Sequence, residues 1–271
     1  MALKLMYITN RPDVAQIAES VGVDRIFVDM EYVGKAARQG GMDTVQSHHT
    51  VQDIKNVKRA VVNSEIMVRC NPIHENSKNE IDAVVEAGAD LVMLPYFKTA
   101  DEVKVFLEYV GGRVKTMLLL ETPEAAACID EILKLDGIDE MFIGLNDLSL
   151  GYGKKFMFEL LSDGTVERLC FKFKEKHVPY GFGGIAALGK GMLPSERIIK
   201  EHYRLGSTCA ILSRSFCDAN KIADVNEIRS VFVNGVREIR ALEAECALHM
   251  SYFTDNKEKV KEIVSTITAK I

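Results

Sequence analysis

The segment KTMLLLETPEA, residues 115–125, joins a short apolar run directly to the start of a helix. The run Lys115–Leu120 has the length of one buried strand, and Pro123 is a favourable residue for the first turn of a helix. The same order of strand and helix recurs along the chain, which is typical of a fold with parallel strands. We therefore predict eight strands, at Lys4–Thr9, Arg25–Met30, Ile66–Arg69, Leu91–Leu94, Lys115–Leu120, Glu140–Ile143, Val178–Gly181 and Thr208–Leu212.

Helical patterns lie between these strands. We predict helices at Asp13–Ser20, Ser77–Glu86, Thr99–Tyr109, Pro123–Leu133 and Pro194–Tyr203. The chain has 271 residues, of which 47% are apolar, and an eight-stranded α/β barrel takes roughly 250 residues. No linker rich in Pro, Gly or Ser divides the chain. The predicted fold class is therefore α/β, a TIM (β/α)8 barrel that forms a single domain over residues 1–271.

Two parts of the chain depart from this regular alternation. After the eighth strand, Ala219–Arg240 and Asp255–Lys270 show two long helical patterns. One barrel does not need both, so we expect extra C-terminal helices, over residues 219–271, that cover one end of the barrel or contact a neighbouring subunit. The other part is Glu31–Thr50, which lacks clear periodicity. A loop of that length in a compact domain is usually functional.

Composition excludes several classes of protein. The formal net charge is −5, so the chain has no basic field for nucleic acid. No apolar run reaches the roughly 18 residues that a membrane span needs. The first residues, MALKLMYITN, lack the apolar core of a signal peptide. The six cysteines form no CxxC pair, which suits a reducing compartment. We expect a cytoplasmic protein that binds neither nucleic acid nor membranes.

Polar residues follow the predicted strands, at the rim where parallel barrels place their chemistry. Glu121 follows the fifth strand and Asp147 follows the sixth, 26 positions later. This is the spacing of one strand-helix unit, so the two carboxylates can converge on one point. The other residues that we note at or just after the ends of predicted strands are Glu31, Arg69, Pro95, Tyr96, Asn146, Gly183, Gly184, Ser213 and Arg214.

A pair of carboxylates at this rim indicates a metal site. Mg²⁺ and Mn²⁺ prefer oxygen ligands and keep open positions for water and substrate. Zinc favours His or Cys, and no His lies beside Glu121 or Asp147 in the sequence. Two other interpretations stay open: Glu121 as an acid at a helix N-terminus, and Asp147 as an acid in a turn. Gly144, at the end of the sixth strand, would let the backbone approach a ligand closely.

Five segments between Gly22 and Gly153 carry a resemblance to a known family: GVDRIFVDMEY, MVRCNP, AGADLVMLPYFKTADE, LLLETPEA and GIDEMFIGLNDLSLGYG. They resemble the HpcH/HpaI aldolase / citrate lyase family, and the similarity continues more weakly through GFGG and LGSTCAILSRSF to Phe216. The resemblance implies a TIM barrel of the phosphoenolpyruvate/pyruvate superfamily that assembles into homo-oligomers, trimers or hexamers. It implies a metal-dependent (class II) aldolase, a carbon-carbon lyase. The substrate would be a 4-hydroxy-2-oxo acid, cleaved to pyruvate or a relative and an aldehyde.

The resemblance also implies roles for individual residues. Glu121 and Asp147 match the family's ligands for a divalent metal, Mg²⁺ or Mn²⁺. Arg69 matches an arginine that stabilises the enolate oxygen. Asn146, Asp147 and Gly184 match the places where the pyruvate carboxylate is held. Asp29 and Glu31 match the acids of an Asp-Gly-Glu-His segment.

The chain departs from the family after Glu31, where Tyr32 stands in place of the usual His. A phenol is a poor base at neutral pH because its ordinary pKa is near 10. His48 and His49 lie at the far end of the same segment, and either His49 or water would take the proton instead. Three further residues, Lys35, Arg38 and Gln39, either meet an anionic end of the substrate or are simply exposed to solvent.

Two alternatives to an aldolase remain. An acyl-CoA lyase, a condensing enzyme or an oxaloacetate decarboxylase would use the same metal-enolate core in another reaction. With Tyr32 in place of His, the protein would otherwise be a barrel that binds metal and ligand with little catalysis.

Overall fold

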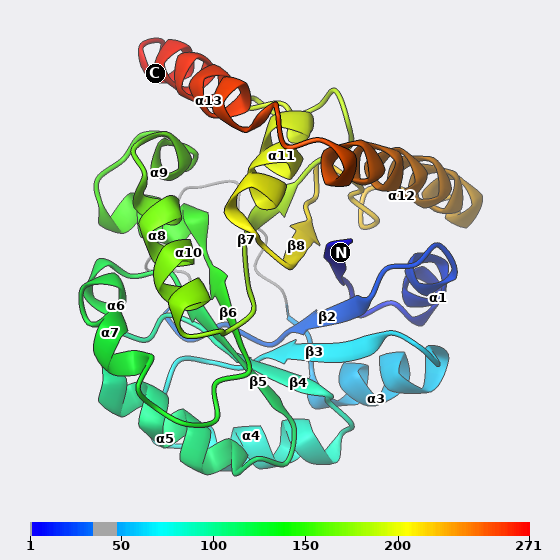
Figure 1. The fold of residues 1–271 in the computed structure, drawn as a ribbon. Coiled ribbons are helices and arrows are strands. Elements are labelled where there is room, and N and C mark those ends of the chain that lie inside the picture. The colour runs from blue at the N-terminus through cyan, green and yellow to red at the C-terminus, as the bar shows by residue number, and fades with distance from the viewer. Residues whose placement is uncertain (1, 35–47) are drawn as a thin grey trace.

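The eight predicted strands close into one barrel in the computed structural model, which describes residues 2–34 and 48–271 (Figure 1). The strands are β1 (Lys4–Ile8), β2 (Arg25–Asp29), β3 (Glu65–Arg69), β4 (Leu91–Leu94), β5 (Lys115–Leu120), β6 (Glu140–Ile143), β7 (Tyr180–Ile185) and β8 (Cys209–Leu212). Neighbouring strands are parallel in sequence order, and β1 pairs with β8 to close the ring, with Met6 opposite Ile211. The predicted α/β class and TIM barrel are confirmed.

The bounds predicted for the seventh strand are wrong. We predicted Val178–Gly181, but β7 runs from Tyr180 to Ile185 and takes in the glycines that were placed in the following loop. Glycine is rare inside strands, so a run of three in six residues hides the strand signal. The ladder between β7 and β8 also shifts register between Gly181 and Gly184.

Helices surround the barrel. They are α1 (Pro12–Ser20), α3 (Val51–Ala60), α4 (Ser77–Glu86), α5 (Ala100–Val110), α6 (Pro123–Ala127), α7 (Ile129–Ile132), α8 (Leu145–Gly151), α9 (Glu159–Ser162), α10 (Thr165–Glu175), α11 (Ser195–Leu205), α12 (Val225–Leu248) and α13 (Phe253–Thr268). The single helix predicted at Pro123–Leu133 is broken at Cys128 into α6 and α7. Within the described ranges, none of the helices combines the length and the apolar character that a bilayer span requires.

Capping boxes set the starts of α3 and α5. Thr50 and Thr99 each accept a hydrogen bond from the third backbone N–H of the helix, and Asp53 and Glu102 return a bond to the cap residue. This reciprocal pairing satisfies donors that the first helical turn leaves over. It fixes the direction in which the chain enters α3, immediately after His49.

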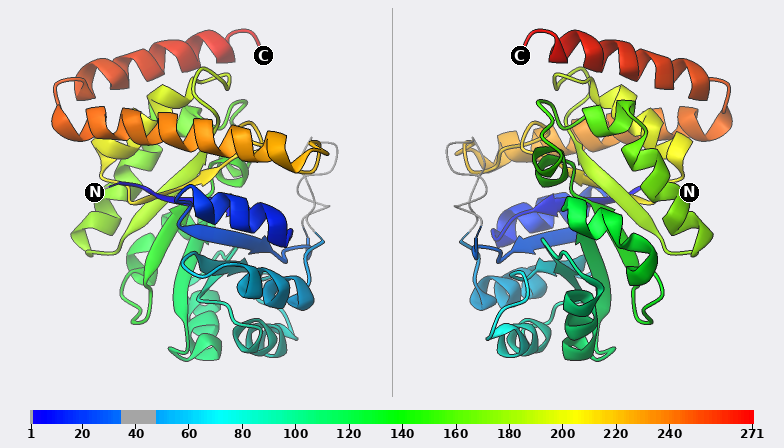
Figure 2. Two further views of the ribbon diagram at one scale, coloured as in Figure 1. Left: turned by 90° about the vertical axis from the view of Figure 1, so that its right-hand side faces the viewer. Right: turned by 90° about the vertical axis from the view of Figure 1, so that its left-hand side faces the viewer.

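The two C-terminal helices lie against their own barrel (Figure 2). α12 packs beside α1 and α11, and α13 crosses over α11 and α9. The side chain of Asn256 on α13 is fully buried and donates to the Arg197 carbonyl and to Glu201 on α11. The chain therefore covers one side of its barrel itself, and contact of these helices with a neighbouring subunit stays a prediction.

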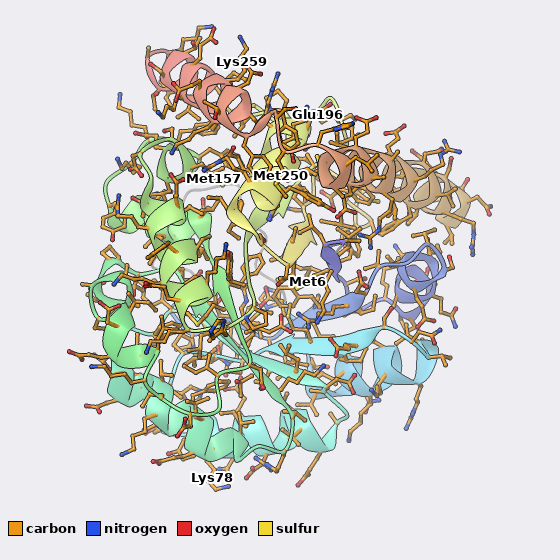
Figure 3. The ribbon with its side chains drawn as sticks, viewed as in Figure 1. Met6, Lys78, Met157, Glu196, Met250 and Lys259 are labelled. Atoms are coloured by element: carbon orange, nitrogen blue, oxygen red, sulfur yellow. The ribbon has the colours of Figure 1, made fainter. Side chains whose placement is uncertain are left out.

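The inside of the barrel is filled by a layer rich in methionine. Met6, labelled in Figure 3, belongs to this layer. Its fully or nearly fully buried members are Met6, Phe27, Met67, Leu91, Met93, Met117, Leu119, Phe142 and Cys209. Methionine side chains are unbranched and flexible, so they can fill irregular gaps in the interior of the barrel. The layer separates the charged groups at the two ends of the barrel.

A buried ion cluster closes the amino-terminal end of the barrel. Arg25 is 0% exposed and donates to both oxygens of Glu140 and to Glu65. Lys115 also binds Glu65, and Lys4 lies 3.6 Å from Glu140. Charges inside a protein need partners and hydrogen bonds to offset the lost hydration.

His202 is a second buried polar group that affects the stability of the fold. It is fully buried on α11 and its ring stacks on Phe182 of β7, with centroids 3.9 Å apart. One ring nitrogen is bonded to the Ser207 hydroxyl at 2.8 Å. Burial lowers the pKa of His202 to about 3, because a charged imidazolium is poorly solvated there.

Replacing Arg25 by Ala is expected to lower the free energy of unfolding by about 3–5 kcal/mol, because buried Glu140 loses its main counter-charge. Urea denaturation followed by circular dichroism measures the change. Lys78→Ala is the control, since Lys78 is 61% exposed (Figure 3) and its pair with Asp82 is at the surface. That variant should change stability by less than about 1 kcal/mol. Equal effects of the two substitutions would contradict the assignment.

Acid should destabilise the protein through His202. Its pKa is lower in the folded state than the ordinary value near 6.5, so its contribution is complete above pH 6.5 and is lost as the pH falls towards 3. Between pH 7 and pH 5, His202→Gln should lose about 2 kcal/mol less stability than the wild type. Exposed His249→Gln is the control, and an unchanged pH slope in His202→Gln would disprove the effect.

Candidate functional site

A cavity of about 700 Å³ opens at the carboxyl ends of the strands. Its floor is apolar and comes from the top of the methionine-rich layer, including Phe27, Met93, Leu119 and Phe142. Its wall is polar. The predicted site residues that line it are Asp29, His48, His49, Arg69, Glu121, Asn146, Asp147, Gly183 and Gly184.

Glu121 is buried and lies directly after β5. Its Oε1 atom accepts a hydrogen bond from the backbone N–H of Tyr96, at 3.0 Å. Tyr96 has a φ of 49°, a left-handed conformation that costs a residue with a side chain about 1–3 kcal/mol. The fold tolerates this strain at the point where an amide reaches the carboxylate. Glu121 is thus held in the cavity wall, although it also lies next to the start of α6.

Gly144 makes room for the Glu121 side chain. A Cβ atom at position 144 would lie 2.7 Å from Oε2 and 2.8 Å from Cβ of Glu121. We predicted that this glycine allows backbone to approach a ligand. In the structure the close approach is to Glu121, so Gly144 acts through the carboxylate.

Asp147 is the third residue of α8, where we had predicted a turn. Its Oδ1 atom accepts from the Asn146 side-chain amide at 3.2 Å. The side chain is half-buried and lines the same cavity as Glu121. The two acids therefore line one cavity, and their convergence on a metal ion stays a prediction.

The donor set of this pair suits a hard divalent cation. Glu121 and Asp147 offer carboxylate oxygens only, and Mg²⁺ or Mn²⁺ prefer such oxygens. Within the described part of the chain, no group of three or more His, Cys, Asp and Glu side chains could enclose a metal. An ion held by two protein ligands keeps positions for water and substrate, as catalytic magnesium sites do.

Arg69 forms the other charged feature of the cavity. Its Nε and Nη2 atoms donate to the two oxygens of Asp29, each at 2.8 Å, and Nε lies 3.3 Å from Glu31. Burial opposes its charge, but Asp29, Glu31 and Glu121 together raise the pKa of Arg69 above its ordinary value. The guanidinium is therefore a permanent cation, and its bidentate pair with Asp29 fixes the plane of the group.

The two acids of the second strand have different places. Asp29 lines the cavity, whereas Glu31 is buried behind Arg69 and does not contribute to the described wall. Tyr32 is 66% exposed and is also absent from that wall. His49 lines the cavity, and its Nδ1 atom accepts a hydrogen bond from the Asp29 backbone N–H at 3.0 Å. Lys35, Arg38 and Gln39 lie outside the described residues.

The wall between β8 and β1 is polar in a way that our sequence analysis partly missed. Asn10 after β1 and Asn220 after β8 join the noted Ser213 and Arg214 there. Single asparagines in loops carry no sequence signal, because asparagine is frequent in ordinary turns. Tyr7 also lines this side, and burial raises the pKa of its phenol, which donates to the Cys217 carbonyl.

Comparison with known proteins decides the family. The family model described as HpcH/HpaI aldolase/citrate lyase matches residues 4–158. The chain belongs to this family. The matched residues include Glu121, Asp147 and Arg69, and end within the segment after α8.

Individual members of the HpcH/HpaI family are distant relatives. A hydroxypyruvate/pyruvate aldolase from Sagittula stellata is 24% identical over 52% of this chain, and a 2-keto-3-deoxy-L-rhamnonate aldolase from Escherichia coli is also 24% identical over 52%. The chain spans 61% and 58% of their lengths. Two solved family structures, from Desulfitobacterium hafniense and Burkholderia cenocepacia, have TM-scores of 0.59 and 0.60. Their sequences are 17% and 16% identical to this chain. The aligned regions cover 88% and 84% of this chain, and 93% and 94% of the two solved chains, so the likeness shows a shared fold.

Gly144→Ala is expected to displace the Glu121 side chain, because the new methyl group would overlap it. Overpacking of this kind costs about 1–3 kcal/mol of stability. The specific readout is hydrogen exchange at the Tyr96 amide, which should lose protection when Oε1 moves away. Amides in the middle of β5 are the internal control. Unchanged exchange at Tyr96 would show that the glycine is not needed for the carboxylate.

Proposed function

We propose that this protein is a metal-dependent aldolase, a carbon-carbon lyase that cleaves or forms a 4-hydroxy-2-oxo acid through a pyruvate-type enolate. One observation carries the proposal: Glu121, Asp147 and Arg69 face the same cavity of an HpcH/HpaI family barrel. Two carboxylates suit a divalent ion, and a fixed cation beside them suits the charge that develops on an enolate oxygen. Relatives that are named as aldolases support the same reaction class.

Glu121 and Asp147 would hold Mg²⁺ or Mn²⁺. When bound, the ion supplies Lewis-acid polarisation of the 2-oxo group. The chain prepares this pair in advance: the Tyr96 amide orients one carboxylate, and the Asn146 amide orients the other. Oriented ligands lower the cost of reorganisation when ligand binds.

Arg69 would carry positive charge to the enolate oxygen. Its pairing with Asp29 fixes the plane of the guanidinium, so that Nη1 has a defined direction. A group fixed before the reaction stabilises the transition state more than a mobile one, because little reorganisation remains. The carboxylate of the oxo acid would lie near Asn146 and Gly184. At Gly184 the absence of a side chain exposes the backbone.

The size of the cavity supports a substrate longer than pyruvate. The wall between β8 and β1 supplies Asn10, Ser213, Arg214 and Asn220, which suit hydroxyl groups and an anionic end. The aldehyde half would lie on this side. A hydroxylated aldehyde agrees with the relative named for 2-keto-3-deoxy-L-rhamnonate, a polyhydroxy acid.

The deciding test is exchange of the pyruvate methyl protons in D2O with Mg²⁺ or Mn²⁺, followed by proton NMR. Exchange requires formation of the enolate. The wild type should exchange with metal and stop when the metal is chelated. A barrel that only binds ligand would not exchange, and activity with acyl-CoA thioesters in place of 2-oxo acids would instead indicate an acyl-CoA lyase.

Glu121→Gln and Asp147→Asn should each slow metal-dependent exchange at least about a hundredfold, because several kcal/mol of charge stabilisation depend on the ion. Matched controls are Glu124→Gln on α6 and Asp130→Asn on α7, whose side chains are 55% and 69% exposed. Those variants should exchange at the wild-type rate. Wild-type turnover in Glu121→Gln would refute the metal assignment.

A further inference from the structure

We propose that Tyr7 and Arg11 are positioning residues that hold the wall after β8, residues 217–220, in the shape that receives a hydroxylated aldehyde. This inference rests on the proposed aldolase function and on the side of the cavity given there to the aldehyde half. It assigns separate parts of the cavity to the two substrates. Residues at the ends of β3, β5 and β6 serve the enolate, and the junction of β1 with β8 serves the aldehyde.

The wall after β8 is an irregular segment that belongs to no helix or strand. All of its residues line the cavity: Cys217, Asp218, Ala219 and Asn220. A hydrogen bond from the Lys221 amide to the Asp218 carbonyl, at 2.9 Å, closes a turn at the end of the segment. Backbone outside helices and strands has no regular ladder of hydrogen bonds, so its carbonyl groups need partners from elsewhere.

Tyr7 of β1 supplies the first of these partners. Its side chain is buried, and its hydroxyl donates to the Cys217 carbonyl at 3.0 Å. The ring packs edge-on against Phe232 of α12, with centroids 4.8 Å apart, so packing holds the hydroxyl in place. Burial raises the pKa of this phenol, which therefore keeps its proton and stays a donor.

Arg11, immediately before α1, supplies the second partner. Its Nη1 atom donates to the Ala219 carbonyl at 3.0 Å. Its Nε and Nη2 atoms donate to the two oxygens of Asp13, at 3.2 and 2.6 Å. Such a fork fixes the plane of a guanidinium, so Nη1 reaches the carbonyl from a defined direction. The two donors thus bind carbonyl groups on either side of Asp218.

The bond between Arg11 and Ala219 joins two segments that carry polar residues of the cavity. Arg11 directly follows Asn10, and Ala219 directly precedes Asn220. Both asparagines line the cavity. Their amides donate and accept hydrogen bonds, which suits the hydroxyl groups of an aldehyde. Loss of the bond would let the two segments move apart, while the residues assigned to the enolate keep their own contacts.

The test compares two aldehydes that differ by one hydroxyl group, glycolaldehyde and acetaldehyde, in aldol addition to pyruvate. Arg11→Gln should raise the KM for glycolaldehyde about tenfold, the upper range of what one hydrogen bond contributes. The KM for acetaldehyde should stay near its wild-type value. Exchange of pyruvate methyl protons should keep the wild-type rate and KM, because that reaction contains no aldehyde.

Arg113→Gln is the matched control. Arg113 also pairs with a carboxylate, that of Asp82, and also donates to backbone carbonyl groups. Its side chain is 40% exposed, against 33% for Arg11. It lies directly before β5, at the opposite end of the barrel, and does not line the described cavity. This variant should keep the wild-type KM for both aldehydes.

The positioning can be measured without any substrate, by hydrogen exchange. The amides of Cys217 and Lys221 close turns beside the wall, and Tyr7→Phe should speed their exchange about threefold or more, because one bond to the segment is lost. Tyr180→Phe is the matched control. Tyr180 is also 4% exposed and donates to a backbone carbonyl, but at the start of β7, where the barrel has its other end.

The outcomes distinguish the inference from the proposed function. An equal rise of KM for both aldehydes, or a parallel loss of pyruvate exchange, would overturn the positioning role. Full recovery in Arg11→Lys would also overturn it, because lysine keeps the charge but not the fork. Unchanged hydrogen exchange at the wall in Tyr7→Phe would contradict it without any assay of activity. Absence of pyruvate exchange in the wild type would instead overturn the aldolase function itself.

Discussion

Pairing between β1 and β8 closes the sheet, and the geometry of the rim depends on this closure. Because all strands are parallel, closure brings every carboxyl end to one side, so residues from β2, β3, β5 and the segment after β6 share a cavity. Among Asp29, Arg69, Glu121, Asn146 and Asp147, only Asn146 and Asp147 are close in the sequence. Barrel geometry, rather than local sequence, makes a carboxylate pair and an arginine into one candidate site.

Charge is distributed unevenly between the two ends of the barrel. At the amino-terminal end, Arg25 is balanced by Glu65 and Glu140, with Lys115 and Lys4 beside them. At the rim, the charges of Asp29, Glu31 and Glu121 all act on Arg69. Asp147 and Arg214 line the same cavity, so acids and arginines from different strand ends share the rim.

Small conformational costs accompany the orientation of the rim. Tyr96 adopts a left-handed backbone conformation, and its amide donates a hydrogen bond to Glu121. Position 144 is a glycine, and a Cβ atom there would overlap the Glu121 side chain. Asp29 uses its amide and its carboxylate on different partners. Strain and crowding of this kind are typical of sites where groups are oriented before a ligand arrives.

The sequence by itself determined the class of fold, the eight strands and the positions of Glu121 and Asp147, because strand length, helix starts and acids after strands are local signals. It misjudged β7, whose glycines resemble a loop, and joined α6 to α7. Only the tertiary structure decided which atoms meet: the His49 ring on the Asp29 amide, 20 residues away, and the Tyr96 amide on Glu121, 25 residues away. Such bonds depend on the register of neighbouring strands and on the direction of the chain between them. Neither is encoded in the spacing of residue types, so these contacts could be found only in the folded chain.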